Sequence, residues 1–235
     1  MGDVHSQDEP LQKAVDFLRQ NSLTPIFLGD LFDSQHEFGN AAETYKIVRQ
    51  AERELGAIVL HSNHQHKLLR FLAGNPVRMT ENLGRTLRDF RESEISLTEV
   101  GEWLSSHPYG AVFQDCRGRE YRAAHAFFPG RFQVPSALGL SLIHRVEKKL
   151  INQFLYGPVV KDDTGKRVRL EWWKEPKNRD FRRVSGHYHT IYEDRHSLVL
   201  DGGSGGSSQE FMDPGDEFLP VYDVNRELLL RFRRP

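Results

Sequence analysis

The sequence predicts an α/β protein in which a mixed two-sheet sandwich is flanked by helices, and residues 1–235 are expected to form one domain. In the first half, short apolar runs alternate with amphipathic segments, as strands and helices do when they follow one another. The second half instead holds pairs of strand-like segments separated by turn residues, which indicates antiparallel pairing. No internal repeat is present.

The first half is expected to contain helices joined by two short buried strands. Over 9–20, Leu11, Val15 and Leu18 recur at near-helical spacing, and Pro10 occupies a first turn, where proline is tolerated. A second helix over 40–55 should end at Gly56. The other expected elements are helices at about 65–73, 81–91 and 97–105 and strands within 25–30 and 57–60.

The second half is expected to be richer in strands. Segments 110–114 and 120–125 should pair as a hairpin, followed by a helix over roughly 140–155 and a polar, loop-rich stretch over 157–180. Further strands are expected at 181–185, 197–200, 220–224 and 227–232. The glycine-rich segment 202–206 follows an apolar strand, which favours a tight loop near a ligand.

The composition excludes several classes of function. Lys and Arg number 32 against 33 Asp and Glu, so no overall basic field is available for strong nonspecific binding of nucleic acid. The single cysteine, Cys116, rules out an intramolecular disulfide and a thiolate metal cluster. No apolar run reaches about 18 residues and no secretory signal is recognised, so the sequence predicts a cytoplasmic enzyme with no membrane partner.

Polar side chains cluster where the predicted strands end. Asp3 and His5 are two residues apart, so an extended segment presents both on one face, and His187 and His189 repeat this spacing. The remaining members of the set are Asp30, Asn63, His64 and His125. Ligand sites in α/β sheets form outside the carboxyl ends of strands. A mixed set of carboxylate, amide and imidazole groups suits Mn, Fe or Zn better than Mg or Ca, so the sequence predicts a metal centre.

Five short blocks carry a family resemblance. They are Gly2-Asp3-Val4-His5, Gly29-Asp30-Leu31-Phe32-Asp33, Ser62-Asn63-His64, Ala124-His125-Ala126 and Gly186-His187-Tyr188-His189. In this order they resemble the calcineurin-like metallophosphoesterases of the phosphoprotein phosphatase-like branch. The nearest resemblance is to the phosphatase module of bacterial polynucleotide kinase-phosphatases. The resemblance implies an αββα sandwich and a phosphoric ester hydrolase.

The resemblance also implies two ligand sets for two divalent ions. These are Asp3, His5, Asp30 and His189 for one ion, and Asp30, Asn63, His125 and His187 for the other. Manganese is expected, and iron or zinc would also suit. Two ions about 3.5–4 Å apart would share a hydroxide that attacks phosphorus. His64 would then be the general acid that protonates the leaving oxygen, with Asp33 orienting its ring.

The chain departs from the family pattern in three places. Ser62 replaces a glycine, so the turn before Asn63 must tolerate a β-carbon. Ser34 stands where close relatives carry a phosphate-binding arginine. Either one of Arg131, Arg179, Arg182 and Arg183 supplies that charge instead, or the affinity for terminal phosphomonoesters is weak. The family's first apolar strand is missing ahead of Gly2, which suggests a shortened or cropped start and predicts unpaired backbone groups on neighbouring strands.

The sequence leaves the substrate open. A nucleotide-like phosphomonoester or phosphodiester is the leading interpretation, with a Ser/Thr protein phosphatase acting on phosphoprotein, or a diadenosine tetraphosphatase-like hydrolase, as alternatives. Outside the enzymes, an inactive metal-binding module is the remaining interpretation. Trp172 and Trp173 lie among basic residues and would either stack on bases or place one indole inward and one at a rim. The oligomeric state is not predicted.

Overall fold

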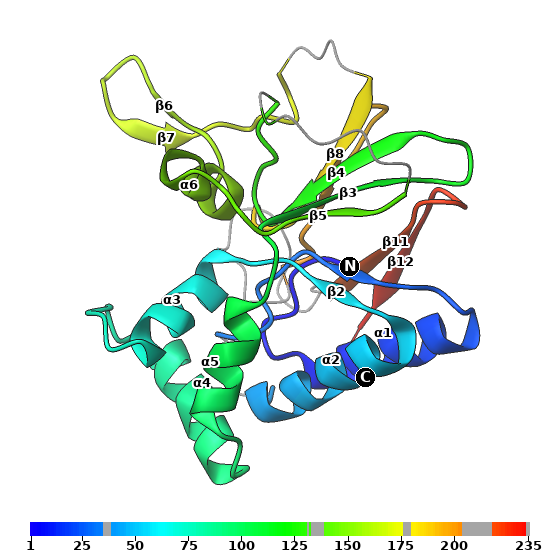
Figure 1. The fold of residues 1–235 in the computed structure, drawn as a ribbon. Coiled ribbons are helices and arrows are strands. Elements are labelled where there is room, and N and C mark those ends of the chain that lie inside the picture. The colour runs from blue at the N-terminus through cyan, green and yellow to red at the C-terminus, as the bar shows by residue number, and fades with distance from the viewer. Residues whose placement is uncertain (35–38, 131, 133–138, 176–179, 204–217, 234–235) are drawn as a thin grey trace.

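The computed structural model describes residues 1–34, 39–130, 132, 139–175, 180–203 and 218–233. Its elements form four layers, in which two layers of strands lie between helices (Figure 1). Helices α1 to α5 cover one outer face, and α6 packs on the other. The helices are α1 Asp8–Gln20, α2 Ala41–Leu55, α3 Asn63–Leu72, α4 Glu81–Glu92, α5 Leu97–Ser105 and α6 Lys148–Tyr156. The predicted mixed α/β sandwich is therefore confirmed.

The larger sheet has six strands in the order β5-β3-β4-β8-β10-β9. They are β3 Gly110–Gln114, β4 Glu120–Ala124, β5 Ser141–Ile143, β8 Phe181–Ser185, β9 Ile191–Glu193 and β10 Ser197–Leu200. The three central strands β4, β8 and β10 are parallel, whereas β3, β5 and β9 pair antiparallel with their neighbours. The carboxyl ends of the three parallel strands consequently open at the same edge of the sheet.

In the second strand layer, the first two residues of the chain connect two separate pairs of strands. Its pairs are the parallel strands β1 Ile26–Phe27 and β2 Ile58–Val59, and the hairpin of β11 Leu219–Asp223 and β12 Leu228–Phe232. The Met1 amine donates to the Ile26 carbonyl at 2.9 Å, and the Leu28 amide donates to the Met1 carbonyl at 3.0 Å. On the other side, the Gly2 amide donates to the Pro220 carbonyl at 2.9 Å. The expectation of unpaired neighbours is wrong at these positions, because Met1 and Gly2 bridge the gap without forming an assigned strand.

The core between the two strand layers follows the two-residue period of a strand. On β10, Leu198 and Leu200 point into this core, whereas Val199 points outward. On β4, Ala123 points inward and Ala124 packs against Phe154 of α6. The other buried members of the inner core are Leu28, Leu60, Ala111, Tyr121, Val184 and Tyr222. Both faces of the larger sheet are therefore covered by apolar side chains.

Several predicted elements differ from those observed. The helix expected over roughly 140–155 is replaced by β5, which pairs with β3, and by the shorter helix α6. The stretch expected to be loop-rich holds the hairpin of β6 Val159–Lys161 and β7 Arg167–Arg169. Strands of three residues are too short to display a hydrophobic period, so only their pairing partners define them. Trp172 and Trp173 are both buried, at 2% and 4% exposure, so neither forms a rim.

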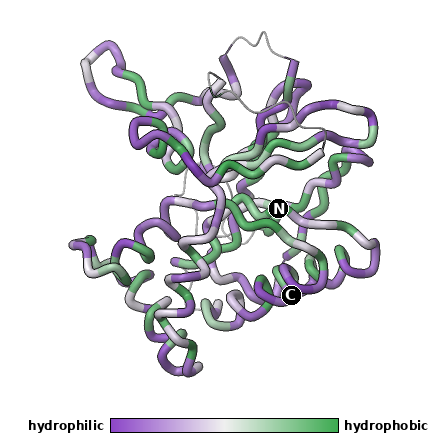
Figure 2. Tube along the Cα trace, viewed as in Figure 1, coloured by the Kyte–Doolittle hydropathy of each residue, from purple (hydrophilic) through white to green (hydrophobic). Residues whose placement is uncertain are grey.

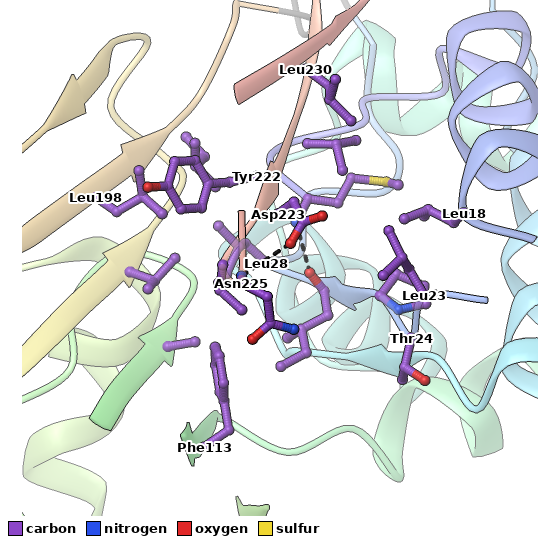
Figure 3. A pocket seen from close by; sticks show the side chains of 18 of the residues that line it. Leu18, Leu23, Thr24, Leu28, Phe113, Leu198, Tyr222, Asp223, Asn225 and Leu230 are labelled. Carbon is purple, nitrogen blue, oxygen red and sulfur yellow. Dashed lines mark hydrogen bonds between the residues drawn. The ribbon is translucent and has the colours of Figure 1, made fainter. Parts of the chain in front are cut away.

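Hydrophobic residues are concentrated on the strands at the centre of the molecule and hydrophilic residues on the outer loops and helix faces (Figure 2). A cavity of about 330 Å³ lies between the strand layers near the amino end of β1, and its lining includes Leu28, Phe113, Leu198 and Tyr222 (Figure 3).

Among the described residues, no helix has both the length and the apolar character that crossing a bilayer requires.

The packing of the inner core predicts how two leucines should differ in stability. Leu200 is buried between the layers, at 1% exposure, whereas Leu142 on the edge strand β5 is 37% exposed. Replacing Leu200 by Ala should lower the free energy of unfolding by about 2–5 kcal/mol. The substitution leaves a cavity between the two strand layers, and these layers cannot move together to fill it. Leu142→Ala should cost under about 1 kcal/mol. Denaturant unfolding followed by circular dichroism measures both, and equal losses would contradict this account of the core.

Candidate metal centre

The candidate site lies where parallel strands from both layers end. Asp30 follows β1, and Asn63 follows β2 at the first turn of α3. His125 follows β4 and His187 follows β8. Asp3 reaches the same edge from the N-terminal segment that joins β1 to β11. Each of these side chains comes from a different segment. The strands that precede them run parallel within each layer, so their carboxyl ends lie at the same edge and the side chains meet there.

Asp3, His5 and Asp30 form the first group, with one ligand atom of each lying within 4.8 Å of the others. The His5 ring places Nδ1 3.1 Å from the Phe32 carbonyl oxygen, which can only accept a hydrogen bond. Nδ1 therefore carries the proton, and Nε2 presents its lone pair 3.6 Å from Asp30 Oδ2. Burial lowers the pKa of His5, which favours this neutral form.

Asp30, His125 and His187 form the second group within the same distance limit. His125 Nδ1 lies 3.0 Å from the Leu28 carbonyl oxygen and must donate to it, so Nε2 presents a lone pair. That nitrogen is 3.4 Å from Asp30 Oδ2, 2.7 Å from Asn63 Oδ1 and 3.1 Å from His187 Nδ1. An imidazole, an amide oxygen and a carboxylate thus converge, as the resemblance implies for the second ion.

Convergence of these lone pairs is the observation that fits a metal. Acceptor atoms held this close repel one another unless a cation or a proton lies between them. His187 Nε2 is also buried without a hydrogen-bond partner among the described residues. Because Asp30 belongs to both groups, a carboxylate shared by two ions is compatible with the geometry. The ligand types are oxygen and nitrogen, which suit divalent transition metals.

The charges in the site reinforce this fit. Burial opposes ionisation of Asp30, yet protons on the facing imidazoles of His125, His64 and His5, which a bound cation would replace, hold the pKa of Asp30 well below its usual value. Burial raises the pKa of Asp3 well above its usual value, and the nearby carboxylates of Asp201 and Asp30 raise it further. A buried group of carboxylates of this kind is stable in the ionised form when cations are bound among them.

His64 and Asp33 form a hydrogen-bonded pair beside the two candidate ligand groups. His64 Nδ1 lies 2.9 Å from Asp33 Oδ2, while His64 Nε2 is 4.0 Å from Asp30 Oδ2. The Thr86 hydroxyl and the Asp33 carboxylate are 3.2 Å apart, which fixes the carboxylate against α4. Although burial favours neutral His64, Asp30 and Asp33 raise its pKa above the ordinary value. Asp33 thus holds the ring in place, and the two facing carboxylates favour its protonated form.

Asp201 is a buried residue beside the site, and it is not among the site residues that the sequence predicts. It follows β10, is 1% exposed and accepts a hydrogen bond from the His189 amide at 2.7 Å through Oδ2. Its Oδ1 accepts from the Gly203 amide at 3.0 Å. Its position in the sequence could have indicated a role, because Asp201 follows an apolar strand, as Asp30 does. Asp201 holds the loop that carries His189, whose side chain lines the site.

Backbone strain is concentrated at this centre. Nine described residues other than glycine occupy the left-handed region, and five of them belong to the site: His5 (φ 47°), Asp30 (φ 45°), Asp33 (φ 66°), His187 (φ 72°) and His189 (φ 48°). Each such conformation costs on the order of 1–3 kcal/mol, so the surrounding contacts must enforce it. Gly186 shows one reason for the tight geometry: a β-carbon there would overlap the Asp3 carboxylate, which accepts from the His187 amide at 2.9 Å.

The residues enclose a small polar cavity of about 120 Å³. Its lining is Asp3, His5, Asp30, Asp33, Asn63, His64, Arg169, His187 and His189. The larger apolar cavity of Figure 3 has no lining residue in common with it. The chemistry of the molecule is therefore expected at the polar cavity, since the apolar one gathers no ligand set.

The structure accommodates both serines that replace residues of the family pattern, Ser62 and Ser34. Ser62 has an extended backbone (φ −128°, ψ 172°), which accommodates a β-carbon, and its hydroxyl caps α3 by accepting from the Gln65 amide. Ser34 is buried at 3% exposure, and the Gln7 side chain donates to its hydroxyl at 3.5 Å. The position of the family arginine is thus filled by a small neutral residue.

The two described members of the predicted set of phosphate-binding arginines lie away from the polar cavity. Arg183 donates to the Phe128 carbonyl at 2.8 Å and packs over the Phe127 ring at 4.4 Å. Arg182 is buried and pairs with Glu193 at 2.9 Å. Neither lines the polar cavity. Arg131 and Arg179 lie outside the described residues.

Known proteins resemble the chain over most of its length. No family model matches it. It is 25% identical over 240 residues to the asymmetrical bis(5'-nucleosyl)-tetraphosphatase PrpE of Oceanobacillus iheyensis, with 94% of this chain and 90% of that protein aligned. The protein of the same name from Bacillus velezensis is 24% identical over 173 residues, covering 72% of this chain and 59% of that protein. These names support the predicted phosphoric ester hydrolase.

A solved structure supports the fold. A crystal structure described as a "putative diadenosine tetraphosphatase" superposes with a TM-score of 0.57 at 18% identity, covering 98% of this chain and 90% of that one. The relatives agree with a metallophosphoesterase-type family. The finer resemblance to the polynucleotide kinase-phosphatase branch stays a prediction.

The shared position of Asp30 predicts the outcome of removing it. Asp30→Ala should lose both ions, because no other described carboxylate belongs to both ligand groups. Asp33→Ala is the matched control, since Asp33 contacts His64 but belongs to neither group. Elemental analysis after manganese loading and dialysis should show two equivalents in the wild type and in Asp33→Ala, and less than one in Asp30→Ala. Two equivalents in Asp30→Ala would refute the bridging role.

Proposed function

We propose that this protein is a dinuclear metal-dependent phosphoesterase that hydrolyses a nucleotide-like phosphoester. The observation that carries the proposal is the position of Asp30, one buried carboxylate facing two ligand groups whose lone pairs converge. Manganese is the ion we propose, because the donor set combines carboxylate, amide and imidazole. The names of the relatives support a nucleotide substrate over a phosphoprotein.

The protein's own side chains have separable tasks in such a reaction. Two divalent ions, when bound, would supply Lewis acidity for water activation and positive charge against the phosphoryl oxygens. The tautomers of His5 and His125, fixed by backbone carbonyls, orient their Nε2 atoms toward Asp30. His64 would donate its Nε2 proton to the leaving oxygen, and Asp33 would hold the ring through Nδ1.

A substrate panel tests the proposal. The manganese-loaded protein should be assayed with diadenosine tetraphosphate, a nucleoside monophosphate and a phosphoserine peptide. We expect faster turnover of a nucleotide substrate than of the phosphopeptide, and none above background in Asp30→Ala. A wild type that holds two metal equivalents but hydrolyses no nucleotide substrate would overturn the proposed activity. A preference for the phosphopeptide would instead favour a protein phosphatase.

The role of His64 predicts a dependence on the leaving group. His64→Ala should retain both ions but slow hydrolysis of substrates with poor leaving groups by about 10²–10⁴-fold, because the departing alkoxide lacks a proton donor. Nitrophenyl phosphate, whose leaving group needs little protonation, should lose much less. His66→Ala is the control, since His66 lies on the same helix and contacts His61 instead of the site. Equal losses on both substrates would rule out the acid role.

A further inference from the structure

We propose that Asp201 is the positioning residue for His189 and thereby sets the occupancy of one of the two metal positions. The position concerned is the one at the first ligand group, which comprises Asp3, His5 and Asp30. This inference rests on the proposed dinuclear phosphoesterase and deepens it by naming a side chain that controls one ion independently of the other. Among the described residues, Asp201 belongs to neither ligand group, so it acts through His189.

The loop that carries the site histidines crosses the end of the strand that precedes Asp201. β10 lies between β8 and β9 in the larger sheet, so residues 186–190, which join β8 to β9, pass over the carboxyl end of β10. Asp201 is the first residue after β10, and its amide donates to the Thr190 carbonyl at 3.1 Å. The Asp201 carboxylate is therefore buried between the end of its own strand and the histidine loop.

Backbone amides occupy both oxygens of the Asp201 carboxylate. Oδ2 accepts from the His189 amide at 2.7 Å, and Oδ1 accepts from the Gly203 amide at 3.0 Å. Because the two donors reach different oxygens, both hydrogen bonds require a side chain with two acceptor atoms. An asparagine at this position would turn its NH₂ group toward one of the two amides, and two donors would then face each other. The hydrogen bonds alone thus call for a carboxylate at position 201.

The orientation of the His189 ring depends on its backbone. In the described part of the chain, Nδ1 of His189 has no hydrogen-bond partner, whereas carbonyl oxygens fix Nδ1 of His5 and Nδ1 of His125. The His189 backbone is in the left-handed region, with φ 48°, and neighbouring contacts must enforce such a conformation. The hydrogen bond from the His189 amide to Asp201 is a short contact at that position. It therefore directs the ring toward the polar cavity that His189 lines.

Asp201 is itself held by the strand layers. It follows Leu200, which is buried in the inner core on β10. The next residue, Gly202, packs so closely on Phe218 that a β-carbon would overlap the Phe218 carbonyl oxygen. The Phe218 amide donates to the Gly202 carbonyl at 3.1 Å. The end of β10 thus fixes the carboxylate, and the carboxylate fixes the loop.

The second ligand group is held by other contacts. The His187 amide donates to the Asp3 carboxylate at 2.9 Å, and the Gly186 amide donates to the His125 carbonyl at 2.9 Å. Both bonds lie at the start of the histidine loop, whereas the carboxylate of Asp201 contacts its end. Removing that carboxylate should therefore displace His189 and leave the second ligand group in place, so that one ion is lost and the other is retained.

Asparagine substitutions test this role with little change in side-chain volume. Asp223→Asn is the matched control for Asp201→Asn, because Asp223 is also a buried aspartate at the end of a strand but does not line the polar cavity. Its Oδ1 alone accepts from the amides of Asn225 and Arg226, at 3.0 and 3.1 Å. A single amide oxygen can make both of these bonds, so asparagine should be tolerated at position 223 but not at position 201.

Manganese affinity and stoichiometry should be measured by equilibrium dialysis with elemental analysis, and coupling between the ions by electron paramagnetic resonance. We expect two equivalents and the spectrum of a coupled pair in the wild type and in Asp223→Asn. Asp201→Asn should bind one ion with unchanged affinity and the other about 10–100-fold more weakly, with the spectrum of an isolated ion at limiting manganese. The retained ion would also show that this variant is folded. Unchanged affinity for both ions, or an equal loss of both, would overturn the proposal.

The variant His189→Ala shows whether Asp201 acts through His189. It should weaken the same ion, and adding Asp201→Asn should cause little further loss, because the residue to be positioned is already absent. Losses that multiply would mean that Asp201 acts on the ion by its own charge, which would overturn the positioning role. A wild type that holds two ions but hydrolyses no phosphoester would refute the proposed function alone, since the manganese affinities would still report on Asp201.

Discussion

The buried carboxylate of Asp30 is the contact on which the arrangement of the centre depends. Imidazoles from three elements lie around it, with His125 at 3.4 Å, His5 at 3.6 Å and His64 at 4.0 Å from Oδ2. Carbonyl groups at Phe32 and Leu28 fix two of these rings, so the nitrogen lone pairs converge on the carboxylate instead of turning away from it. An ionised carboxylate surrounded by such groups in a buried site is compatible with bound cations.

This centre is unfavourable for folding, and the sandwich around it must compensate. Five of its residues adopt left-handed backbone conformations, and Asp3, Asp30 and Asp201 are carboxylates buried close together. The compensating term is apolar burial on both faces of the larger sheet, where inward and outward side chains alternate along each strand. Metal binding would add to it, because ions that bind only the folded state stabilise that state.

Two short segments outside the assigned strands of the larger sheet set how closely the site residues approach one another. Met1 and Gly2 join β1 to β11 and place Asp3 where Gly186 leaves room for its carboxylate. At the other side, Trp173 and Tyr188 connect the β6–β7 hairpin to the histidine loop. The parallel strands thus bring the site residues to one edge of the molecule, whereas these short segments set the distances between the site side chains.

The sequence by itself determined the identity of the chemistry. Periodicity predicted the long helices α1 and α2 and the strands β3, β4, β8 and β10, because each of these carries its own local pattern. Short polar blocks after apolar runs likewise indicated Asp30, His125 and His187, and the two-residue spacing of Asp3 and His5 indicated that pair. What only the tertiary structure decided are features that depend on partners distant along the chain. The three-residue strands exist through pairing, Asp201 matters through its contact with the His189 amide, and Arg169 reaches the cavity because the hairpin is anchored to Tyr188. No local pattern encodes such proximity, because it arises from long-range packing.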